Sequence, residues 1–418
     1  MKFLLIANND TDGIGQPVVN LFNNLIKKGH KAKIIALHKF TKNKNIIKIK
    51  RSFLSRLYAL LLDFLKKDFN DLFGFDHSTI EYKDIENYIE ETDVIIIYTF
   101  HKMISNNILE KLFKSGKLVY LRPLDMEMIT GGCHFNQKCE KYRSDCSNCP
   151  KLRFNELITL PKENLITKRT IVRNFKPKII VQNNYVKNLL KTSSIFNFSK
   201  TIKISVGVNA SRSKFYLKKK ARKILGIDID EKIILFAIYN LSSYNKGGHV
   251  LKKSLKIFED KFLNNKNYNK DLSNVRLITL GNKNNFSLDL EKIKWSHKGF
   301  VSSDAQLNLY YRSADVLVSP SLYDFGPHVV NESVSNDLPV VSFEVGTARD
   351  VIVSGVNGFL VPCYDNSKFA NSIQKIIFNK KDLKNNSLRK RIKSSRSAAY
   401  EAKSFIKMSY KDIKNKKN

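Results

Sequence analysis

The sequence predicts an α/β protein with two domains, each built on an open parallel β-sheet. Short apolar runs alternate with helical patterns along the chain, which is typical of successive β-α-β units. At 418 residues the chain is too long for one ordinary core. Apolar residues make up 42% of it and charged residues 27%, so the composition is that of a globular protein rather than a disordered one.

The first half of the chain contains five expected strands. Each is a short apolar run, and they lie at 3–7, 33–37, 93–100, 117–121 and 178–182. The opening run is too short for the apolar region of a signal peptide and has no small-residue cleavage site after it, so we interpret it as a buried strand. No stretch approaches the roughly 20 apolar residues that span a bilayer. We therefore expect a cytoplasmic protein.

The second half repeats this pattern. Strands are expected at 232–239, 275–281, 315–320 and 339–343, and helices near 247–262, 305–313, 327–335 and 366–377. We expect domain boundaries that give an N-terminal domain, a C-terminal domain and a Lys-rich helical tail, at 1–205, 206–395 and 396–418. Ligands bind open α/β sheets at the carboxyl ends of their strands, so the chemistry should lie there.

The stretch "SLYDFGPHVVNES" at 321–333 follows one of these apolar runs. Pro327 fits the first turn of a helix, and the N-terminal end of such a helix attracts phosphate oxygens. Asp324 precedes this helix and Glu332 lies within it. An ionised carboxylate only accepts hydrogen bonds, so both acids suit a ligand rich in hydroxyl groups. Taken alone, such a pair is more often a loop residue and a solvated helix residue.

Residues 319–361 resemble the E-x7-E region of the retaining GT-B glycosyltransferases of the glycosyl transferases group 1 family. Asp324 and Glu332 stand at its two acids, and "LPVVSF" and "GVNGFLV" match the strand and turn that follow. The resemblance implies a GT-B fold, in which two Rossmann-like domains face each other across a cleft and a C-terminal helix crosses back. It implies that Asp324 holds the donor sugar and Glu332 the ribose of a nucleotide sugar, with the donor site lined between them by Phe325, Gly326 and Pro327.

Three further segments resemble the same family. In "NLSSYNKGGHVLKKSLKIF" at 240–258, Lys246 and Gly247 stand where the family contacts the donor diphosphate. The match at 9–37 places Gly13 and Gly15 in a loop where the backbone approaches the donor, and a third match covers 297–321. The resemblance implies that Lys246, Asp324 and Glu332 form the catalytic set and that catalysis needs no metal or other cofactor.

Two positions depart from the family pattern. Leu241 stands where the family often has an Arg paired with the Lys, and Leu124 stands where it often has a His before an Asp, here Asp125. These departures leave open an alternative, a non-catalytic pseudo-glycosyltransferase that binds a glycan or a partner protein.

The segment at 125–152 contains four of the five cysteines, Cys133, Cys139, Cys146 and Cys149. Thiolates at this density bind zinc in a reducing compartment, so we expect either a structural zinc site or four reduced packing residues. Disulfides would need an oxidising compartment, which the missing signal peptide argues against. The segment also resembles an insertion in a subset of cell-surface polysaccharide glycosyltransferases. His134 within it could be a metal ligand or an acceptor contact, but we interpret it as a surface residue.

The net charge is +35, which suggests an anionic partner. A nucleic-acid-binding protein is a second alternative, but the chain lacks the aromatic and basic motifs of the common modules, and we expect no nucleic acid. The segment at 39–69 joins a basic stretch to a helical stripe of Leu54, Leu57, Leu61 and Phe64. Such a stripe is more often core than membrane face, yet it suits peripheral binding to an anionic membrane.

The sequence therefore predicts a retaining hexosyltransferase. We expect it to move a sugar from a nucleoside-diphosphate sugar to a glycan or lipid-linked glycan. The resemblance places that reaction in surface polysaccharide biosynthesis, which includes capsule, O-antigen, lipopolysaccharide and exopolysaccharide.

Overall fold

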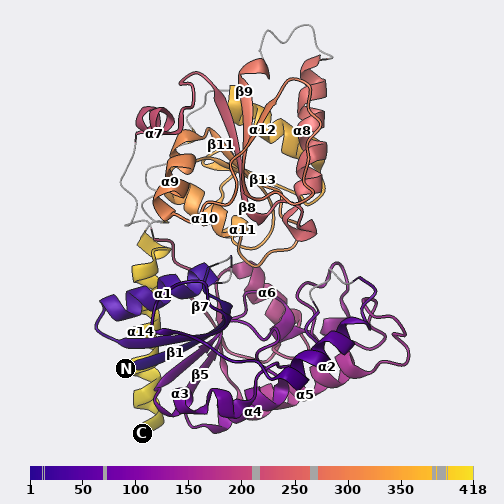
Figure 1. The fold of residues 1–418 in the computed structure, drawn as a ribbon, viewed down its shortest axis with the longest axis vertical. Coiled ribbons are helices and arrows are strands. Elements are labelled where there is room, and N and C mark those ends of the chain that lie inside the picture. The colour runs from indigo at the N-terminus through magenta and orange to yellow at the C-terminus, as the bar shows by residue number, and fades with distance from the viewer. Residues whose placement is uncertain are drawn as a thin grey trace. The chain divides into compact units, whose positions relative to one another are not determined.

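The computed structural model describes residues 1–11, 13, 15–68, 73–209, 217–263, 272–378, 383, 392 and 394–417. The chain divides into two compact units (Figure 1). Unit 1 consists of Met1–Gly207 together with Ala398–Asn418, and unit 2 consists of Val208–Ser397. The end of the chain therefore returns to the unit in which the chain began.

Unit 1 is built on a seven-stranded sheet in which every paired strand is parallel. Its order is β3-β2-β1-β4-β5-β6-β7. The strands are β1 (Lys2–Asn9), β2 (Lys31–His38), β3 (Ile46–Lys48), β4 (Val94–Ile97), β5 (Leu118–Leu121), β6 (Lys178–Val181) and β7 (Thr201–Lys203). The order changes direction between β1 and β4, which is the kind of position where α/β sheets bind ligands.

The helices of unit 1 lie on both faces of this sheet (Figure 1). They are α1 (Gly15–Lys27), α2 (Phe53–Asp63), α3 (Glu86–Glu90), α4 (Asn106–Lys114), α5 (Leu160–Phe175), α6 (Asn184–Thr192) and α14 (Ala398–Lys417), with short 3-10 turns at η1 (Tyr82–Asp84), η2 (Glu127–Ile129) and η3 (Lys141–Arg143). Side chains cap the first turns of α2, α4 and α6, from Ser52, Ser105 and Asn183.

The C-terminal helix α14 is anchored in unit 1 by both apolar and polar contacts. Phe405 is buried in the same core as the strands of the sheet. Glu401 pairs with Arg122 at 2.6 Å, and both side chains are buried. Tyr120 on β5 donates a hydrogen bond to Asp412 at 2.8 Å. A helix that crosses back to the N-terminal domain is what the family resemblance implied, and it is confirmed.

Unit 2 contains a six-stranded parallel sheet of order β10-β9-β8-β11-β12-β13. Its strands are β8 (Lys232–Asn240), β9 (Val275–Asn282), β10 (Lys294–His297), β11 (Val316–Ser319), β12 (Val340–Phe343) and β13 (Gly358–Val361). Its helices are α7 (Lys218–Leu225), α8 (Gly248–Leu263), α9 (Asp304–Ser313), α10 (His328–Ser335), α11 (Ala348–Val351) and α12 (Asn366–Phe378), with 3-10 turns at η4 (Tyr244–Lys246) and η5 (Leu272–Asn274).

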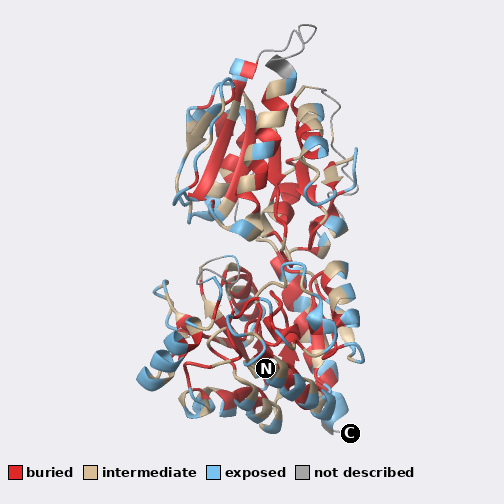
Figure 2. Ribbon diagram, turned by 90° about the vertical axis from the view of Figure 1, so that its right-hand side faces the viewer, coloured by how far each residue is buried: buried red, intermediate tan, exposed pale blue. Residues whose placement is uncertain are grey.

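Both faces of the second sheet are covered. Along β8, Ile234 and Phe236 belong to one apolar core, and Ile233 and Leu235 belong to another on the opposite face. This alternation follows from the period of two in a strand. Figure 2 shows the strands of this sheet as buried and the outer surfaces of the surrounding helices as more exposed. The expected α/β architecture with two parallel sheets is confirmed.

The structure corrects several boundaries. The strand expected at 93–100 is β4 alone, Val94–Ile97. The helix expected from Pro327 begins at His328, because Pro327 has an extended ψ of 101° and serves as the N-cap. Four strands were not predicted, β3, β7, β10 and β13, and none is longer than four residues. In β13 the stretch interpreted as a turn pairs closely with β12, where a Cβ at Gly358 would lie 2.0 Å from the Val340 carbonyl oxygen.

Among the described residues, no helix has the length and apolar character needed to cross a lipid bilayer.

Candidate functional site

The candidate site of unit 2 lies at the carboxyl ends of β8 and β11, two neighbouring strands at the point where the strand order reverses. The loop after β8 leads through η4 to Gly247, and the loop after β11 leads to Pro327. The two loops touch, because the backbone N–H of Leu322 donates to the carbonyl oxygen of Asn245 at 2.8 Å. This is the edge at which open α/β sheets bind ligands.

Lys246 and Asp324 meet across these loops. The Lys246 Nζ lies 2.6 Å from the Asp324 Oδ2, and the Asp324 Oδ1 accepts a hydrogen bond from the Gly326 N–H at 2.9 Å. Asp324 is almost buried, and Lys246 keeps about a third of its side chain exposed. An ammonium group has three N–H donors. One of them is occupied by Asp324, which leaves two for a ligand.

Glycines permit this approach of the two loops. Gly247 has a φ of +73°, and a Cβ there would lie 1.9 Å from the Pro320 carbonyl oxygen. Gly346, after β12, has a φ of +51°, and its Cβ would lie 2.7 Å from the Asp324 carbonyl oxygen. An L-residue at either position would be strained and would push against the backbone that carries Asp324. Gly346 was not predicted as a site residue.

Glu332 lies on α10 and is held by Tyr311 on α9. The Tyr311 hydroxyl donates a hydrogen bond to the Glu332 Oε2 at 2.6 Å. Burial of the carboxyl group raises the pKa of Glu332, the Tyr311 hydrogen bond opposes that rise, and the charge of Asp304 adds to it. Some of the residue stays accessible to solvent. The role of Tyr311 was missed, and its only sequence signal is its place in "YYRSAD", before the strand that leads to Asp324.

Three further residues predicted for the donor site follow Asp324, and their part in donor binding stays a prediction. Phe325 is buried, Gly326 donates to Asp324, and Pro327 caps α10. The structure therefore brings Lys246 and Asp324 into contact and places Glu332 on the helix that follows.

Most of unit 2 matches a known protein family. Residues 218–395 match the family model described as Glycosyl transferases group 1, which includes the loops of Lys246 and Asp324 and the helix of Glu332. Most of unit 2 is therefore similar to this family. An uncharacterized glycosyltransferase of Methanocaldococcus jannaschii is 32% identical over 148 residues. The match covers 34% of this chain and 34% of that protein, so the chain spans about a third of the length of the curated relative that it matches.

Solved structures match along nearly the whole chain. Sucrose-phosphate synthase from Thermosynechococcus elongatus has a TM-score of 0.68 at 15% identity, over 99% of both chains. Anabaena HepE in complex with UDP-glucose has a TM-score of 0.64 at 14% identity, over 98% of this chain and 99% of that one. WaaG, a glycosyltransferase involved in lipopolysaccharide biosynthesis, has a TM-score of 0.59 at 12% identity, over 96% and 95%. At such identities the likeness shows the fold, and the expected GT-B fold is confirmed.

The two departures from the family pattern are apolar packing positions. Leu241 is fully buried in a core of unit 2. Leu124 packs, partly buried, against the main core of unit 1. Neither side chain can replace the polar group that the family often has there.

The two glycines predicted for the donor site lie in unit 1, at the end of β1. A Cβ at Gly15 would lie 2.4 Å from the Asn9 Oδ1, so this glycine allows the loop to fold tightly at the start of α1. A Cβ at Gly13 would meet no atom within 4 Å. Their part in donor binding stays a prediction.

The clustered cysteines are free thiols in unit 1, and Cys133, Cys146 and Cys149 are buried. The Cys133 thiol donates to Cys149, which raises the pKa of Cys133 and lowers that of Cys149. Burial raises the pKa of Cys146 to about 12. Throughout the described part of the chain, no three His, Cys, Asp or Glu side chains form a group that could hold a metal ion. The zinc site stays a prediction.

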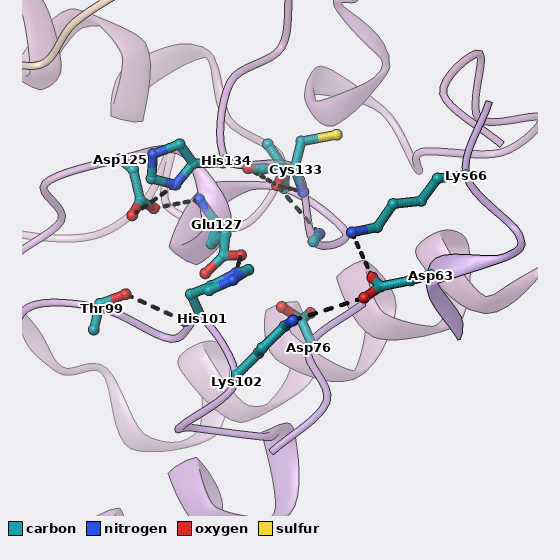
Figure 3. A network of polar contacts seen from close by, with 12 residues as sticks. Asp63, Lys66, Asp76, Thr99, His101, Lys102, Asp125, Glu127, Cys133 and His134 are labelled. Atoms are coloured by element: carbon teal, nitrogen blue, oxygen red, sulfur yellow. Dashed lines mark hydrogen bonds and ion pairs between the residues drawn. The ribbon is translucent and has the colours of Figure 1, made fainter. Parts of the chain in front are cut away.

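A polar cluster of unit 1, hereafter the unit 1 cluster, was not predicted as a whole (Figure 3). The His101 Nδ1 lies 2.7 Å from the Glu127 Oε1, and the His134 Nδ1 lies 3.2 Å from the Asp125 Oδ2. Both carboxylates are buried, and both imidazoles are partly exposed. His134 is thus not a freely solvated surface residue. Asp125, Glu127 and His134 lie within ten residues of one another, whereas His101 is distant in sequence, so the sheet topology brings His101 to Glu127.

Proposed function

We propose that this protein is a retaining glycosyltransferase that moves a hexose from a nucleoside-diphosphate sugar to a glycan or lipid-linked glycan. The observation that carries the proposal is the contact between Lys246 and Asp324, at the carboxyl edge of the sheet of unit 2 and directly before the helix of Glu332. A cation for a diphosphate and two acids for hydroxyl groups lie together at the edge where such sheets bind ligands.

The local geometry indicates what each residue would do. The two remaining N–H donors of Lys246 suit diphosphate oxygens, and the N–H groups that begin α10 add positive potential. A carboxylate has about four lone-pair positions. Asp324 uses one for Lys246 and one for Gly326, so it can still accept from sugar hydroxyls. Glu332 would accept from the ribose, with Tyr311 fixing the orientation of its carboxyl group.

In the proposed reaction, the bond between the anomeric carbon and the diphosphate breaks, and its electron pair stays on the diphosphate. An acceptor oxygen bonds to the same carbon and releases its proton. Lys246 would stabilise the charge that develops on the leaving diphosphate, and such stabilisation lowers the barrier because it is greatest in the transition state. No metal ion is needed for this role.

Two structural relatives support the choice of donor and pathway. HepE was solved with UDP-glucose, a nucleoside-diphosphate sugar, and WaaG is described as acting in lipopolysaccharide biosynthesis. We infer a comparable donor class here and a role in the assembly of a surface polysaccharide.

An exposed helix of unit 1 supports peripheral binding to an anionic membrane. The stripe of α2, interpreted above as more often core, is exposed, with 75% of Leu54 and 62% of Phe64 accessible to solvent. Burial is limited to Ala59 and Leu62 along this helix. The exposed basic residues Lys48 and Lys50 precede this helix, and the exposed Arg56 lies within it. An apolar helix face with flanking cations is typical of segments that lie on anionic lipid.

The pseudo-glycosyltransferase alternative is favoured by Leu124 and Leu241, whose side chains pack in cores. Incubation of the pure protein with a panel of nucleotide sugars separates the two functions. A glycosyltransferase should slowly hydrolyse one donor even without an acceptor, and Glu332→Gln should abolish that hydrolysis. Binding of a donor without any turnover, with or without glycan, would favour the alternative.

A further inference from the structure

The unit 1 cluster lies where the sheet of unit 1 is expected to bind ligands. His101 follows β4, and Asp125 and Glu127 follow β5, the strand next to it. Because the strands are parallel, their carboxyl ends share one edge of the sheet. The cluster is therefore at the same kind of edge as the Lys246 and Asp324 pair, but in the other unit.

The His101 and Glu127 couple has a defined polarity. Glu127 is 1% exposed, and its Oε1 lies 2.7 Å from the His101 Nδ1. In the neutral imidazole, a carboxylate at this distance holds the proton on Nδ1 and leaves Nε2 as a hydrogen-bond acceptor. Among the described residues, Nε2 has no partner and is not among the buried unpaired atoms, and 16% of the side chain is exposed. The couple thus presents one acceptor nitrogen outwards.

The surrounding backbone fixes this couple. The Glu127 N–H donates to the Asp125 Oδ1 at 2.8 Å, and the fully buried Lys168 donates to the Glu127 and Thr130 carbonyl oxygens at 2.7 and 2.8 Å. A Cβ at Gly74 would lie 2.4 Å from the Glu127 Oε1 and 3.1 Å from the His101 Nδ1. Glycine is therefore the residue that lets this loop pass the couple closely. Such support is typical of preorganised binding groups.

Buried polar atoms without partners lie on or just after four neighbouring strands, β1, β4, β5 and β6. They include the Asn8 Oδ1 on β1, the Tyr98 hydroxyl after β4, the Glu127 Oε2 after β5, and both amide atoms of Gln182 after β6. Glu127 and Gln182 are each 1% exposed. Buried polar groups are nearly always paired, so unpaired ones in a row indicate a polar ligand that would supply the missing partners.

The chemistry of these groups favours a neutral, hydroxyl-rich ligand. Three buried carboxylates lie here, those of Asp76, Asp125 and Glu127. The buried cations nearby already have partners, since Lys168 is bound by Asp76 at 2.8 Å and Arg122, directly after β5, is bound by Glu401 at 2.6 Å. A phosphate or sulfate group would be repelled by the acids. Sugar hydroxyls donate to carboxylates and to an imidazole nitrogen and accept from an amide, so they match every group in the row.

We propose that His101, oriented by Glu127, is a sugar-binding residue of unit 1, and that its Nε2 accepts a hydrogen bond from a hydroxyl group of a neutral glycan. The glycan is the acceptor of the transfer reaction, so this inference rests on the proposed function. Glu127 is a positioning residue, which acts on the glycan through His101. Leu124 stands where the family often has a His. The proposed site supplies a different histidine, His101, as the polar group that contacts the sugar.

The test is binding of the full chain to an array of immobilised oligosaccharides that includes neutral, sulfated and phosphorylated members. The wild type should bind a subset of the neutral glycans. His101→Ala should weaken that binding at least tenfold, and His101→Phe, which keeps the ring without its nitrogens, should weaken it equally. Glu127→Gln still offers an acceptor oxygen to Nδ1, so it should retain more binding than either His101 variant.

A matched control is His77→Ala, because the His77 Nε2 is bound to the Ser55 carbonyl oxygen at 2.9 Å and lies outside the cluster. It should bind glycans like the wild type. Three results would overturn the inference: no glycan bound by the wild type, a preference for charged glycans, or full binding by His101→Ala and His101→Phe. Donor hydrolysis without acceptor, measured on the wild type and on His77→Ala, should be equal. Its absence in the wild type would count against the proposed function rather than against this site.

Discussion

Each unit has polar groups at the carboxyl edge of its parallel sheet, but the residues that supply them are spaced differently along the sequence. In unit 2, Asp324 and Glu332 lie eight positions apart, on one loop and the helix after it. In unit 1, His101 and Glu127 are 26 positions apart and follow different strands. A local pattern can be read as a motif, whereas a pair assembled by topology cannot. The difference teaches that the Asp324 and Glu332 pair can be read from the sequence, whereas the His101 and Glu127 pair is visible only in the fold.

The largest effect is expected in unit 2. Glu332→Gln should nearly abolish use of a donor, because an amide has half the acceptor capacity of the carboxylate. Hydrogen bonds to a charged group contribute roughly 1.5 to 3 kcal/mol, or about 10- to 150-fold. Steady-state kinetics with a proven donor measure this loss. Tyr311→Phe, which keeps the carboxylate, should have a smaller effect. Wild-type turnover by Glu332→Gln would remove the ribose role.

Lys246→Ala tests the proposed cation of the unit 2 site. We expect a loss in kcat of roughly 10- to 100-fold that exceeds the loss in donor affinity, because the positive charge matters most as the diphosphate leaves. Presteady-state turnover and calorimetric binding separate the two quantities. A variant that loses affinity but keeps kcat would show that Lys246 only tethers the donor, and full activity would place the diphosphate elsewhere.

The pH dependence of donor affinity reports on Glu332. Burial raises its pKa above the ordinary value of 4.5, so the protonated form persists to higher pH than in an ordinary glutamate. The ionised form is the one that accepts two ribose hydroxyls, so donor affinity should fall as the pH drops through the raised pKa. Calorimetric titrations across this range should show proton release on binding at the acidic end. Glu332→Gln should show neither the fall nor the release, and a parallel fall in both proteins would assign it to another group.

Unit 1 differs from unit 2 in its exposed apolar helix, which vesicle binding tests. The protein should bind vesicles with anionic lipid and dissociate as salt rises, with about 1 kcal/mol from each basic side chain near the surface. Replacing Lys48, Lys50 and Arg51 by Gln should weaken binding and leave donor hydrolysis nearly intact. Leu54→Ser should weaken it through the apolar face. Equal binding to neutral vesicles, or a stronger affinity for nucleic acid, would count against a membrane surface.

The cysteine segment gives the smallest expected effect on the reaction. Elemental analysis of protein purified without chelator should find about one zinc per chain if Cys133, Cys139, Cys146 and Cys149 hold the metal, and stripping it should lower folding cooperativity. Metal-free protein with four titratable thiols and unchanged melting would identify them as packing residues.

Much of the fold followed from the sequence because its signal is local. The apolar runs of β1, β2, β8 and β9 are long enough to predict strands, and each was found within two residues of its expected ends. The edge strand β10, Lys-Trp-Ser-His, is largely polar and therefore resembles a loop, and β3, Ile-Ile-Lys, is too short to show a strand periodicity. Pro327 was assigned to the helix because proline favours the first turn, but its extended ψ makes it the N-cap.

The sequence predicted only those residues of the unit 2 site that belong to spaced motifs. Lys246 and Asp324 were expected to contact the same ligand, and the structure adds that they contact each other. Tyr311 could not be predicted, because its hydroxyl reaches Glu332 from a separate helix. The stripe of α2 has the periodicity of a core-facing helix, and periodicity alone does not say whether anything covers that face.

The most direct test of the account is a thermodynamic cycle between Glu332 and the ribose of the donor. Calorimetry would compare wild type and Glu332→Gln, each with the nucleoside diphosphate that binds best and with its 2′,3′-dideoxy analogue. We predict that losing the ribose hydroxyls weakens the wild type by roughly tenfold or more and weakens Glu332→Gln by less than about threefold. An equal loss in both proteins would contradict the assignment of Glu332 to the ribose, and with it the central claim that this edge of unit 2 holds a nucleotide sugar.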